Sequence, residues 1–363
     1  QLMPAVVPQL KSITIGGALA GVGIESSSFT YGFVHETILE IDILLPDGTV
    51  VLATKDNGHK DLFFGFANSY GTLGYALKVK VLLVPVRKFV KLRHERYSDL
   101  DTYFRALGLV CQDRQVDFVD GTMFEAHELY LTTGKCVDRA EWLSDYTYRH
   151  IYYRSIQQKA VDYLTIHDYL WRWDTDWFWC SKHFFVQHPV VRWLWGRKRL
   201  CSTMYWKLRS RFNRSPLAQR VAKALTGRQE AVIQDVEIPL EHAAEFARFF
   251  NREIGITPVW ICPVMAYDPS ASYPLYPMTP GKLYVNFGFW DVVSTDHEDG
   301  YFDKKVEAKV RELQGKKSLY SNAYYSREAF WQLYNEPAYR ALKARYDPTA
   351  KLKDLYEKCV LKQ

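Results

Sequence analysis

The first ninety residues alternate apolar and polar positions in short runs that predict β-strands joined by tight turns. Thr37–Leu45 and Thr49–Thr54 are two such runs, and the Pro46-Asp47-Gly48 sequence between them is typical of a hairpin turn. The same region is predicted to contain a short strand, a helix and an apolar strand that Pro85 ends: Ile13–Ile15, Asp61–Ser69 and Tyr75–Val84.

Beyond residue 88 the pattern mixes helical and strand periods. Leu240–Ile254 repeats apolar residues at helical spacing, whereas Val259–Ala266 and Leu283–Trp290 have the composition of strands. From residue 316 the pattern changes again, and Ser326 is placed to cap a short helix. We therefore predict an α+β chain in three parts, residues 1–88, 89–315 and 316–363.

Composition excludes several classes of protein. With 48% apolar and 24% charged residues, the 363-residue chain can bury a core in more than one lobe. The six cysteines form no Cys-x-x-Cys pair and no metal-like spacing with histidine, so we predict no metal site and a reducing, cytoplasmic setting. No apolar run has the length of a spanning helix, so membrane contact is expected to be peripheral or made by a segment outside this chain. Because Gln1 opens within sequence typical of a folded domain, we expect a trimmed chain.

The net charge of +6 is concentrated in one segment, residues 168–214, which we name the Trp-rich segment. It contains ten Lys or Arg against three Asp, and seven of the eleven tryptophans. Mixed cations and aromatic rings suit peripheral contact with an anionic membrane. A helical hairpin with buried tryptophans is the alternative. Nucleic-acid binding also uses such residues, but no nucleic-acid motif accompanies them, so we predict no nucleic-acid partner.

A glycine-rich stretch between Gly16 and Gly23 is the first pattern that could bind a ligand. Closely spaced glycines let backbone N–H groups approach a phosphate without interference from a Cβ. The third glycine of a dinucleotide fingerprint and the Gly-Lys-Ser/Thr of a P-loop are both absent. By itself the stretch therefore favours a glycine-rich turn packed against a sheet over a phosphate site.

Longer motifs around this stretch resemble a known family. They are Thr14-Ile-Gly-Gly-Ala-Leu-Ala-Gly-Val-Gly-Ile-Glu-Ser-Ser-Ser28 with Tyr31-Gly32, Tyr70-Gly-Thr-Leu-Gly-Tyr75, Val259-Trp-Ile-Cys-Pro263, and Tyr324-x-x-Arg-Glu-x-Phe-Trp331. The chain resembles the FAD-binding domain of the vanillyl-alcohol-oxidase (PCMH-type) flavoproteins. Within them it is most similar to the Δ24-sterol reductases, also named 24-dehydrocholesterol reductases, and their bacterial relatives. The resemblance covers nearly all 363 residues.

The resemblance implies a PCMH-type FAD-binding domain over residues 1–88, an α+β substrate cap with an antiparallel sheet over 89–315, and a C-terminal segment, 316–363, that returns to the flavin site. In that family one of two loops that clasp the FAD pyrophosphate matches residues 14–27, which we name the glycine loop; the other would precede Gln1. The cofactor contacts that it implies are Thr14, Gly16, Gly17, Gly21, Gly23, Ile24, Ser26, Ser27, Gly71, Thr72, Leu73 and Gly74.

By the same resemblance, the chain is expected to reduce an isolated C=C bond of a lipid with FAD, using NADPH as the electron source. Such a reaction needs a proton donor and electron-rich walls, because positive charge develops on carbon. Tyr324 is the first candidate for the donor, with packing between lobes as its alternative. Glu25 is the second, with capping of its own loop as its alternative. Trp260, Asn286 and Asn322 are the candidate substrate contacts, and Asn322 stands where the sterol reductases have an acidic residue.

Two lipids compete as the substrate, a sterol side chain and a methylene-branched fatty acyl chain. The Trp-rich segment departs from the sterol enzymes and favours the acyl chain. Two other functions fit the same scaffold. One is an oxidase or dehydrogenase of an alcohol or sugar, and the other is a non-catalytic lipid-binding protein on the membrane surface.

Overall fold

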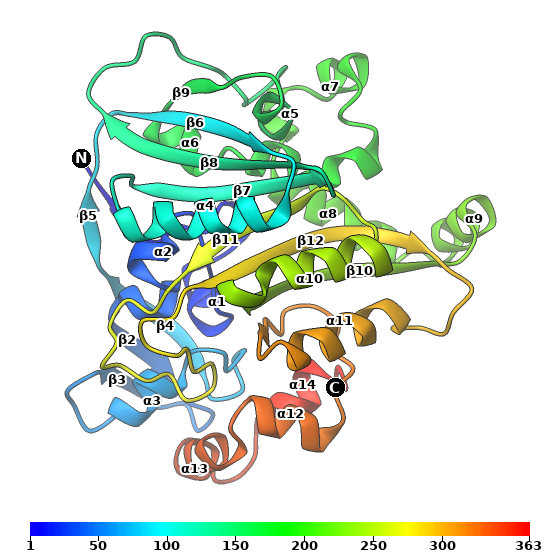
Figure 1. Cartoon of the computed structure of the whole chain (residues 1–363). Helices are drawn as coiled ribbons and strands as arrows, with labels where there is room; N and C mark the ends of the chain where they lie inside the picture. Colours follow the sequence, from blue (N-terminus) through cyan, green and yellow to red (C-terminus); the bar gives the residue numbers. More distant parts are fainter.

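The computed structural model describes the backbone of residues 1–363 and the side chains of all residues except 218, 221–223 and 225. Strands and helices form a mixed α and β structure with one large antiparallel sheet (Figure 1). The expected α+β class with an antiparallel sheet is thus confirmed.

The first lobe contains the predicted hairpin. Strands β2 (Ile38–Leu44) and β3 (Val50–Thr54) pair antiparallel, and β4 (Tyr75–Val81) adds to the other edge of β2. In the turn, the Gly48 amide donates to the Leu45 carbonyl at 3.0 Å, and Gly48 has a φ of +96°, which a glycine adopts without strain. The predicted strand over 75–84 is divided at Leu82, and its second half, β5 (Leu83–Pro85), pairs with β1 (Leu2–Pro4).

One prediction in this lobe is wrong. The segment Ile13–Ile15 is not a strand, because the Thr14 hydroxyl accepts a hydrogen bond from the Gly17 amide at 3.1 Å and starts helix α1 (Ile15–Ala20). The other helices of the lobe are α2 (Ser28–Tyr31), the 3₁₀-helix η1 (Val34–Thr37) and α3 (Lys60–Gly65), the last shorter than predicted.

The large sheet has eight strands in the order β13-β10-β12-β11-β7-β8-β6-β9, and every pair is antiparallel. Their bounds are β6 (Phe89–Tyr97), β7 (Phe118–Glu125), β8 (Glu128–Val137), β9 (Val161–Thr165), β10 (Gln229–Pro239), β11 (Val259–Val264), β12 (Tyr284–Ser294) and β13 (Lys316–Lys317). The predicted strands at 259–266 and 283–290 are confirmed as β11 and β12.

Helices α4 (Leu100–Asp113), α10 (Leu240–Glu253) and α11 (Tyr301–Glu312) cover one face of this sheet (Figure 1). The helix predicted over 240–254 is thus confirmed as α10. Its apolar residues at helical spacing, such as Phe246 and Phe250, are fully buried against Phe287 and Phe289 of β12.

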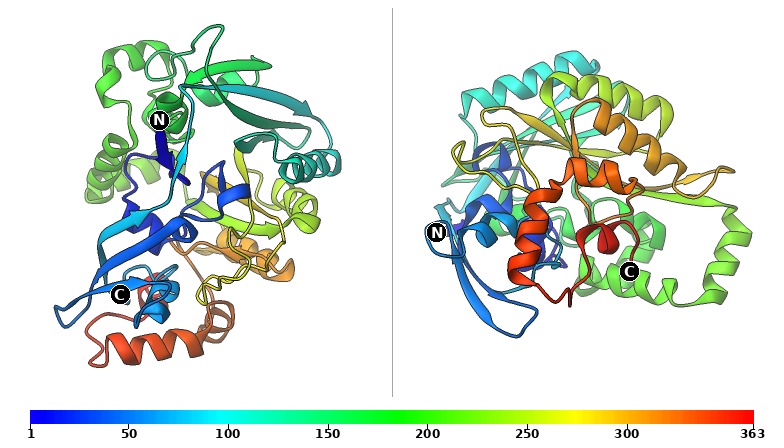
Figure 2. Two further views of the ribbon diagram at one scale, coloured as in Figure 1. Left: turned by 90° about the vertical axis from the view of Figure 1, so that its left-hand side faces the viewer. Right: turned by 90° about the horizontal axis from the view of Figure 1, so that it is seen from below.

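The Trp-rich segment lies on the opposite face, where the two views of Figure 2 also place it. Tyr169, Trp173 and Trp179 are buried there against β6, β7 and β11. The short helices of this region are α5 (Tyr152–Ile156), α6 (Ile166–Leu170), η2 (Asp174–Asp176), η3 (Cys180–Phe184), α7 (Pro189–Trp195), η4 (Arg197–Arg199), α8 (Ser202–Asn213) and α9 (Pro216–Thr226).

The C-terminal segment packs on the first lobe. It consists of α12 (Arg327–Leu333), α13 (Glu336–Tyr346) and α14 (Leu355–Cys359), and the predicted cap is present because the Ala329 amide donates to the Ser326 hydroxyl at 3.2 Å. Phe330, Trp331 and Leu342 share one core with Phe63 and Leu73 of the first lobe. The C-terminal helices and the first lobe, far apart in sequence, thus lie together beneath the large sheet (Figure 1).

Candidate active site

The glycine loop presents an exposed surface at its start. Ile13 and Ile15 are 45% and 46% exposed, and Thr14 and Gly17 beside them are exposed too. The later glycines serve packing, since a Cβ on Gly23 would lie 2.9 Å from both the Ala18 Cβ and the Val34 Cγ2. The loop thus divides into an open first half and a tightly packed second half.

Behind the loop, Glu25 belongs to a buried ionic cluster. Its Oε1 accepts from the Ser26 hydroxyl at 2.5 Å and from Arg172 Nη2 at 3.2 Å. Arg172 also donates to Asp120 Oδ2 at 2.7 Å, and all three charged groups are buried. Burial raises the pKa of Glu25, and the Arg172 charge opposes that rise. We name Glu25, Arg172 and Asp120 the arginine cluster.

The second predicted cofactor stretch, Gly71–Gly74, meets the glycine loop through Tyr70. The Tyr70 hydroxyl donates to the Gly21 carbonyl at 3.2 Å and accepts from the Leu319 amide at 2.8 Å. Gly71 and Gly74 have φ angles of +76° and +136°, which favour glycine. Thr72, Leu73 and Gly74 are buried, and Gly71 is partly exposed.

Two further carboxylates, Asp235 and Glu237, lie on the sheet face opposite the covering helices. They are two positions apart on β10, so they share a face, while Val236 and Ile238 point into the helix-side core. Asp235 Oδ1 accepts from Asn286 Nδ2 at 2.9 Å, and Asp235 Oδ2 accepts from the Tyr320 hydroxyl at 2.9 Å. Tyr276 donates its hydroxyl to Glu237 Oε2. We name Asp235 and Glu237 the carboxylate pair.

The carboxylate pair is held by neutral groups. Among the described side chains no Lys or Arg is ion-paired with either carboxylate; the charge of Lys316 lowers the pKa of Glu237 slightly, and the pKa of Lys316 is itself lowered by burial. Burial raises the pKa of Asp235 to about 6 and that of Glu237 to about 8, and the Asp235 charge adds to the rise at Glu237. Glu237 therefore favours its protonated form near neutral pH.

Sequence reasoning missed this pair. A signal was present, because Asp235 and Glu237 alternate with the apolar residues Val236 and Ile238 and therefore share the other face of the strand. Of the predicted substrate contacts, Asn286 is brought to the pair. Trp260 instead donates to Asp120 at 3.3 Å, and its ring lies 5.6 Å from that of Phe178.

The structure places Tyr324 and Asn322 elsewhere. The Tyr324 amide donates to both Glu307 carboxylate oxygens at 3.1 Å, its ring lies beside Gly300, and the residue is 36% exposed at the α11 side of the sheet. The Asn322 side chain is exposed, and its carbonyl accepts from Lys317. Among the described contacts, none joins Tyr324 to Glu25 or to the carboxylate pair.

The site has features that suit a flavin. Ile13 and Ile15 offer an apolar surface for a ring system, and Gly16 and Gly17 leave backbone accessible at the same edge. The Ser12 and Ser69 side-chain oxygens are buried and have no hydrogen-bond partner among the described residues. Because each is a ready donor or acceptor near a glycine stretch, the residues present fit a cofactor with polar groups.

Comparisons with known proteins agree with this geometry. The Delta(24)-sterol reductase of Homo sapiens is 26% identical over 367 residues, which covers 97% of this chain and 69% of the relative. That of Pisum sativum is 24% identical over 399 residues, covering 98% and 68%. Cytokinin dehydrogenase 7 of Oryza sativa subsp. japonica is 29% identical over 124 residues, covering 33% and 24%. No family model matches the chain. The chain is thus a relative of the Delta(24)-sterol reductases, similar to them over nearly its whole length.

Proposed function

We propose that the protein reduces an isolated C=C bond of a lipid as an FAD-dependent oxidoreductase, with NADPH as the electron source. The observation that carries the proposal is the similarity to Delta(24)-sterol reductases across 97% of the chain, which includes both the glycine loop and the sheet that faces it. A sterol side chain is the first substrate to test. The Trp-rich segment, which favoured an acyl chain, supplies core residues such as Trp173 and Trp179 and therefore does not decide between the two lipids.

We propose the domain arrangement in the same terms. Residues 1–88 would form the C-terminal portion of a PCMH-type FAD-binding domain, with the exposed half of the glycine loop and the backbone of Gly71–Gly74 against the cofactor. Residues 89–315 would form the cap, and 316–363 would return to the flavin site, which the shared core of α12, α13 and the first lobe supports. When bound, FAD supplies hydride chemistry that no side chain of this protein can supply.

The chain's own residues provide surroundings suited to an alkene. Positive charge that develops on carbon is stabilised by aromatic faces. Phe178 and Trp290 have ring centroids 4.4 Å apart, and Trp290 Nε1 donates to Tyr320 at 2.8 Å. The Tyr320 hydroxyl in turn contacts Asp235, so the electron-rich rings of Phe178 and Trp290 lie near a carboxyl group.

The test uses the full-length protein supplied with FAD and NADPH under anaerobic conditions. A sterol with a side-chain alkene and a phospholipid with a methylene-branched acyl chain are offered separately, and products are followed by mass spectrometry. A gain of two hydrogen atoms in either lipid is the expected result. NADPH oxidation without any lipid product would contradict the proposal.

A cytokinin dehydrogenase matches a third of the chain, and this match supports a second candidate function, the oxidation of a small substrate on the same scaffold. That function predicts reduction of the flavin by an alcohol, amine or sugar and no response to NADPH. The same anaerobic preparation distinguishes the two.

We also propose that the protein docks on an anionic phospholipid surface through residues 185–217, which we name the docking surface. The sequence predicted membrane contact through residues 168–214. The start of that segment is excluded, because Tyr169, Arg172, Trp173 and Trp179 are buried. Residues 185–217 contain eight Lys or Arg and no Asp or Glu. Large apolar side chains are exposed among them: Phe185 78%, Val190 57%, Trp193 58%, Leu194 68%, Trp206 53% and Leu217 73%. Exposed rings beside cations match the chemistry of a headgroup layer.

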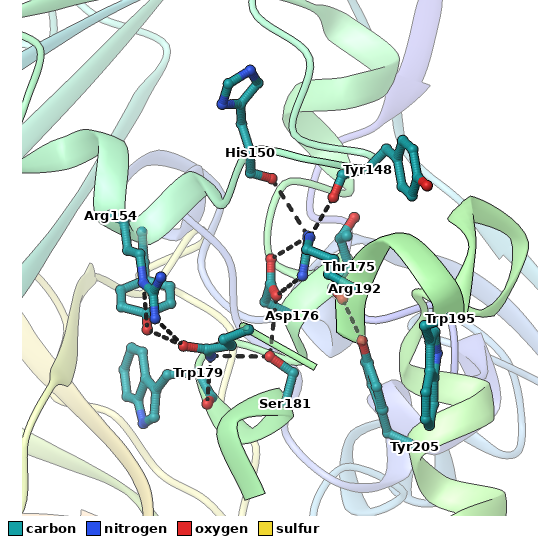
Figure 3. A network of polar contacts seen from close by, with 12 residues as sticks. Tyr148, His150, Arg154, Thr175, Asp176, Trp179, Ser181, Arg192, Trp195 and Tyr205 are labelled. Carbon is teal, nitrogen blue, oxygen red and sulfur yellow. Dashed lines mark hydrogen bonds and ion pairs between the residues drawn. The ribbon is translucent and has the colours of Figure 1, made fainter. Parts of the chain in front are cut away.

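A buried ion pair fixes this surface to the body of the protein (Figure 3). Arg192 of α7 donates to both Asp176 oxygens, at 2.6 and 3.1 Å, and to the carbonyls of Tyr148 and His150. Tyr205 of α8 donates to the Thr175 carbonyl at 2.9 Å. The exposed side chains of α7 and α8 are therefore held in place rather than free to fold inward. No helix whose residues are all described has the length and apolar character to cross a bilayer.

Sedimentation with lipid vesicles tests the docking surface. We expect binding to vesicles that contain phosphatidylglycerol and weak binding to pure phosphatidylcholine. The double variant Trp193→Ala, Leu194→Ala should weaken binding at least about 10-fold, because each substitution removes apolar surface that the membrane would bury. Leu109→Ala, which alters a 60% exposed residue of α4, is the matched control. Equal binding of both variants would overturn the proposal, as would self-association of the wild type that the double variant abolishes.

A further inference from the structure

Reduction of an isolated alkene consumes one proton for each hydride, and the arginine cluster is poorly suited to supply it. This inference rests on the proposed function. Glu25 is 1% exposed behind the glycine loop, and although burial raises its pKa, the charge of Arg172, which it contacts, opposes that rise. Tyr324 lies at the α11 side of the sheet. A donor has to be protonated near neutral pH and has to reach a group that is open to the substrate.

The carboxylate pair meets the first requirement by its placement. Two carboxylates on one strand face, with tyrosine and asparagine as their partners and no ion-paired cation among the described residues, cannot both ionise readily. Glu237 Oε1 is buried and has no hydrogen-bond partner among the described atoms. An unpaired buried oxygen suits a neutral carboxyl far better than a carboxylate. Charged or titratable groups that face the pair are Tyr70, Tyr276, Tyr320, Tyr334 and Lys316.

Tyr320 meets the second requirement. It is 45% exposed, although its hydroxyl donates to Asp235 and accepts from Trp290. Gly288 stands opposite Asp235 in the strand register, and a Cβ there would lie 2.6 Å from Asp235 Oδ1. The carboxyl group therefore lies over a position without a side chain. Leu319, the preceding residue, donates to Tyr70, which contacts Gly21 of the glycine loop. Tyr320 thus lies between the proposed cofactor loop and the carboxylate pair.

We propose that the carboxylate pair stores the proton and that the Tyr320 hydroxyl delivers it to the alkene carbon. The Tyr320 O–H bond breaks as the new C–H bond forms, and the hydride for the neighbouring carbon would be supplied by the reduced flavin of the proposed function. Asp235, in its protonated form, then returns a proton to the Tyr320 oxygen that it contacts. Solvent restores the proton of the pair, so each turnover takes up one hydride and one proton.

The first test needs no cofactor. Infrared spectra of the purified chain are recorded across a pH series, and the C=O band of protonated carboxyl groups is followed. We expect a band that disappears between about pH 6 and 8 in the wild type, and that is changed by Asp235→Asn and by Glu237→Gln but not by the exposed-residue control Glu245→Gln. A band that both pair variants leave unchanged overturns the proposal.

The second test separates this proposal from the proposed function. In full-length protein, Asp235→Asn and Tyr320→Phe should keep flavin reduction by NADPH while reoxidation by the lipid alkene slows at least about 100-fold, the usual contribution of a general acid. Glu237→Gln should remove the fall of that step near pH 8, because the pair then lacks the carboxyl group that loses its proton as the pH rises through about 8. Normal reoxidation in the first two variants overturns the proton route. Wild-type flavin that NADPH cannot reduce overturns the proposed function instead, and the infrared series still decides proton storage.

Discussion

The arginine cluster holds two buried carboxylates and the carboxylate pair holds buried Glu237 beside half-buried Asp235, but the two groups differ in their counter-charge. Glu25 and Asp120 share one guanidinium, which also stacks 3.9 Å from the ring of Tyr169. Asp235 and Glu237 are bonded to neutral hydroxyl and amide groups. A cation fixes charge and geometry, whereas neutral partners allow a proton to come and go. The comparison indicates a structural role for the first group and a chemical one for the second.

The largest effect is expected from breaking the arginine cluster. Arg172→Met should lower the free energy of unfolding by about 3–5 kcal/mol, because two buried carboxylates lose their only ion-paired partner among the described residues. Urea unfolding measures it. Arg105→Met, at an exposed position of α4, should stay within about 0.5 kcal/mol. Similar values for the two variants would remove the structural role of the cluster.

The carboxylate pair should make the free energy of unfolding depend on pH. The folded pKa of Glu237, about 8, lies above the ordinary glutamate value of 4.5, so the folded state binds more protons between these limits. Stability from this group is complete below about pH 4.5 and is lost as the pH rises through about 8. The loss is roughly 1.4 kcal/mol for each unit of raised pKa.

Glu237→Gln should therefore flatten the fall in unfolding free energy across that window, relative to the wild type. Glu245→Gln, at an exposed glutamate whose pKa is lowered by Lys309, is the control and should leave the fall unchanged. An identical slope in Glu237→Gln and the wild type would contradict the assignment.

The smallest effect concerns Ser26, which bridges Glu25 and the Tyr169 hydroxyl, the latter at 2.7 Å. Ser26→Ala should cost about 1 kcal/mol, the usual value of one buried hydrogen bond. Thermal unfolding measures the change, and the effect should vanish in an Arg172→Met background if the three groups act as one unit. Full additivity of the two variants would show that Ser26 acts apart from the cluster.

Local signals in the sequence predicted local structure well. The Pro46-Asp47-Gly48 turn and the Ser326 cap depend on residues within three or four positions, and both are present. The strand predicted at Ile13–Ile15 is absent, because Thr14 caps a helix that starts within this apolar run. A cap signal overrode a short apolar pattern there.

The groups of the site depend on contacts that a linear pattern does not contain. Arg172 meets Glu25 across 147 positions, and Tyr320 meets Asp235 across 85. For the Trp-rich segment, charge and aromatic content predicted membrane contact, with buried tryptophans as the alternative; its first part is buried in the core and its later part is exposed. The alternation of acidic and apolar residues on β10 could have indicated Asp235 and Glu237. Their partners, however, come from β12, from the loop that follows β13 and from the loop at 273–278.

The visible absorption spectrum of the full-length protein, recorded without oxygen before and after NADPH and then after a lipid alkene, tests the central claim most directly. The account predicts a flavin spectrum that NADPH bleaches and that the alkene restores in the wild type. A flavin that NADPH leaves oxidised, or one that the alkene cannot reoxidise, would contradict it.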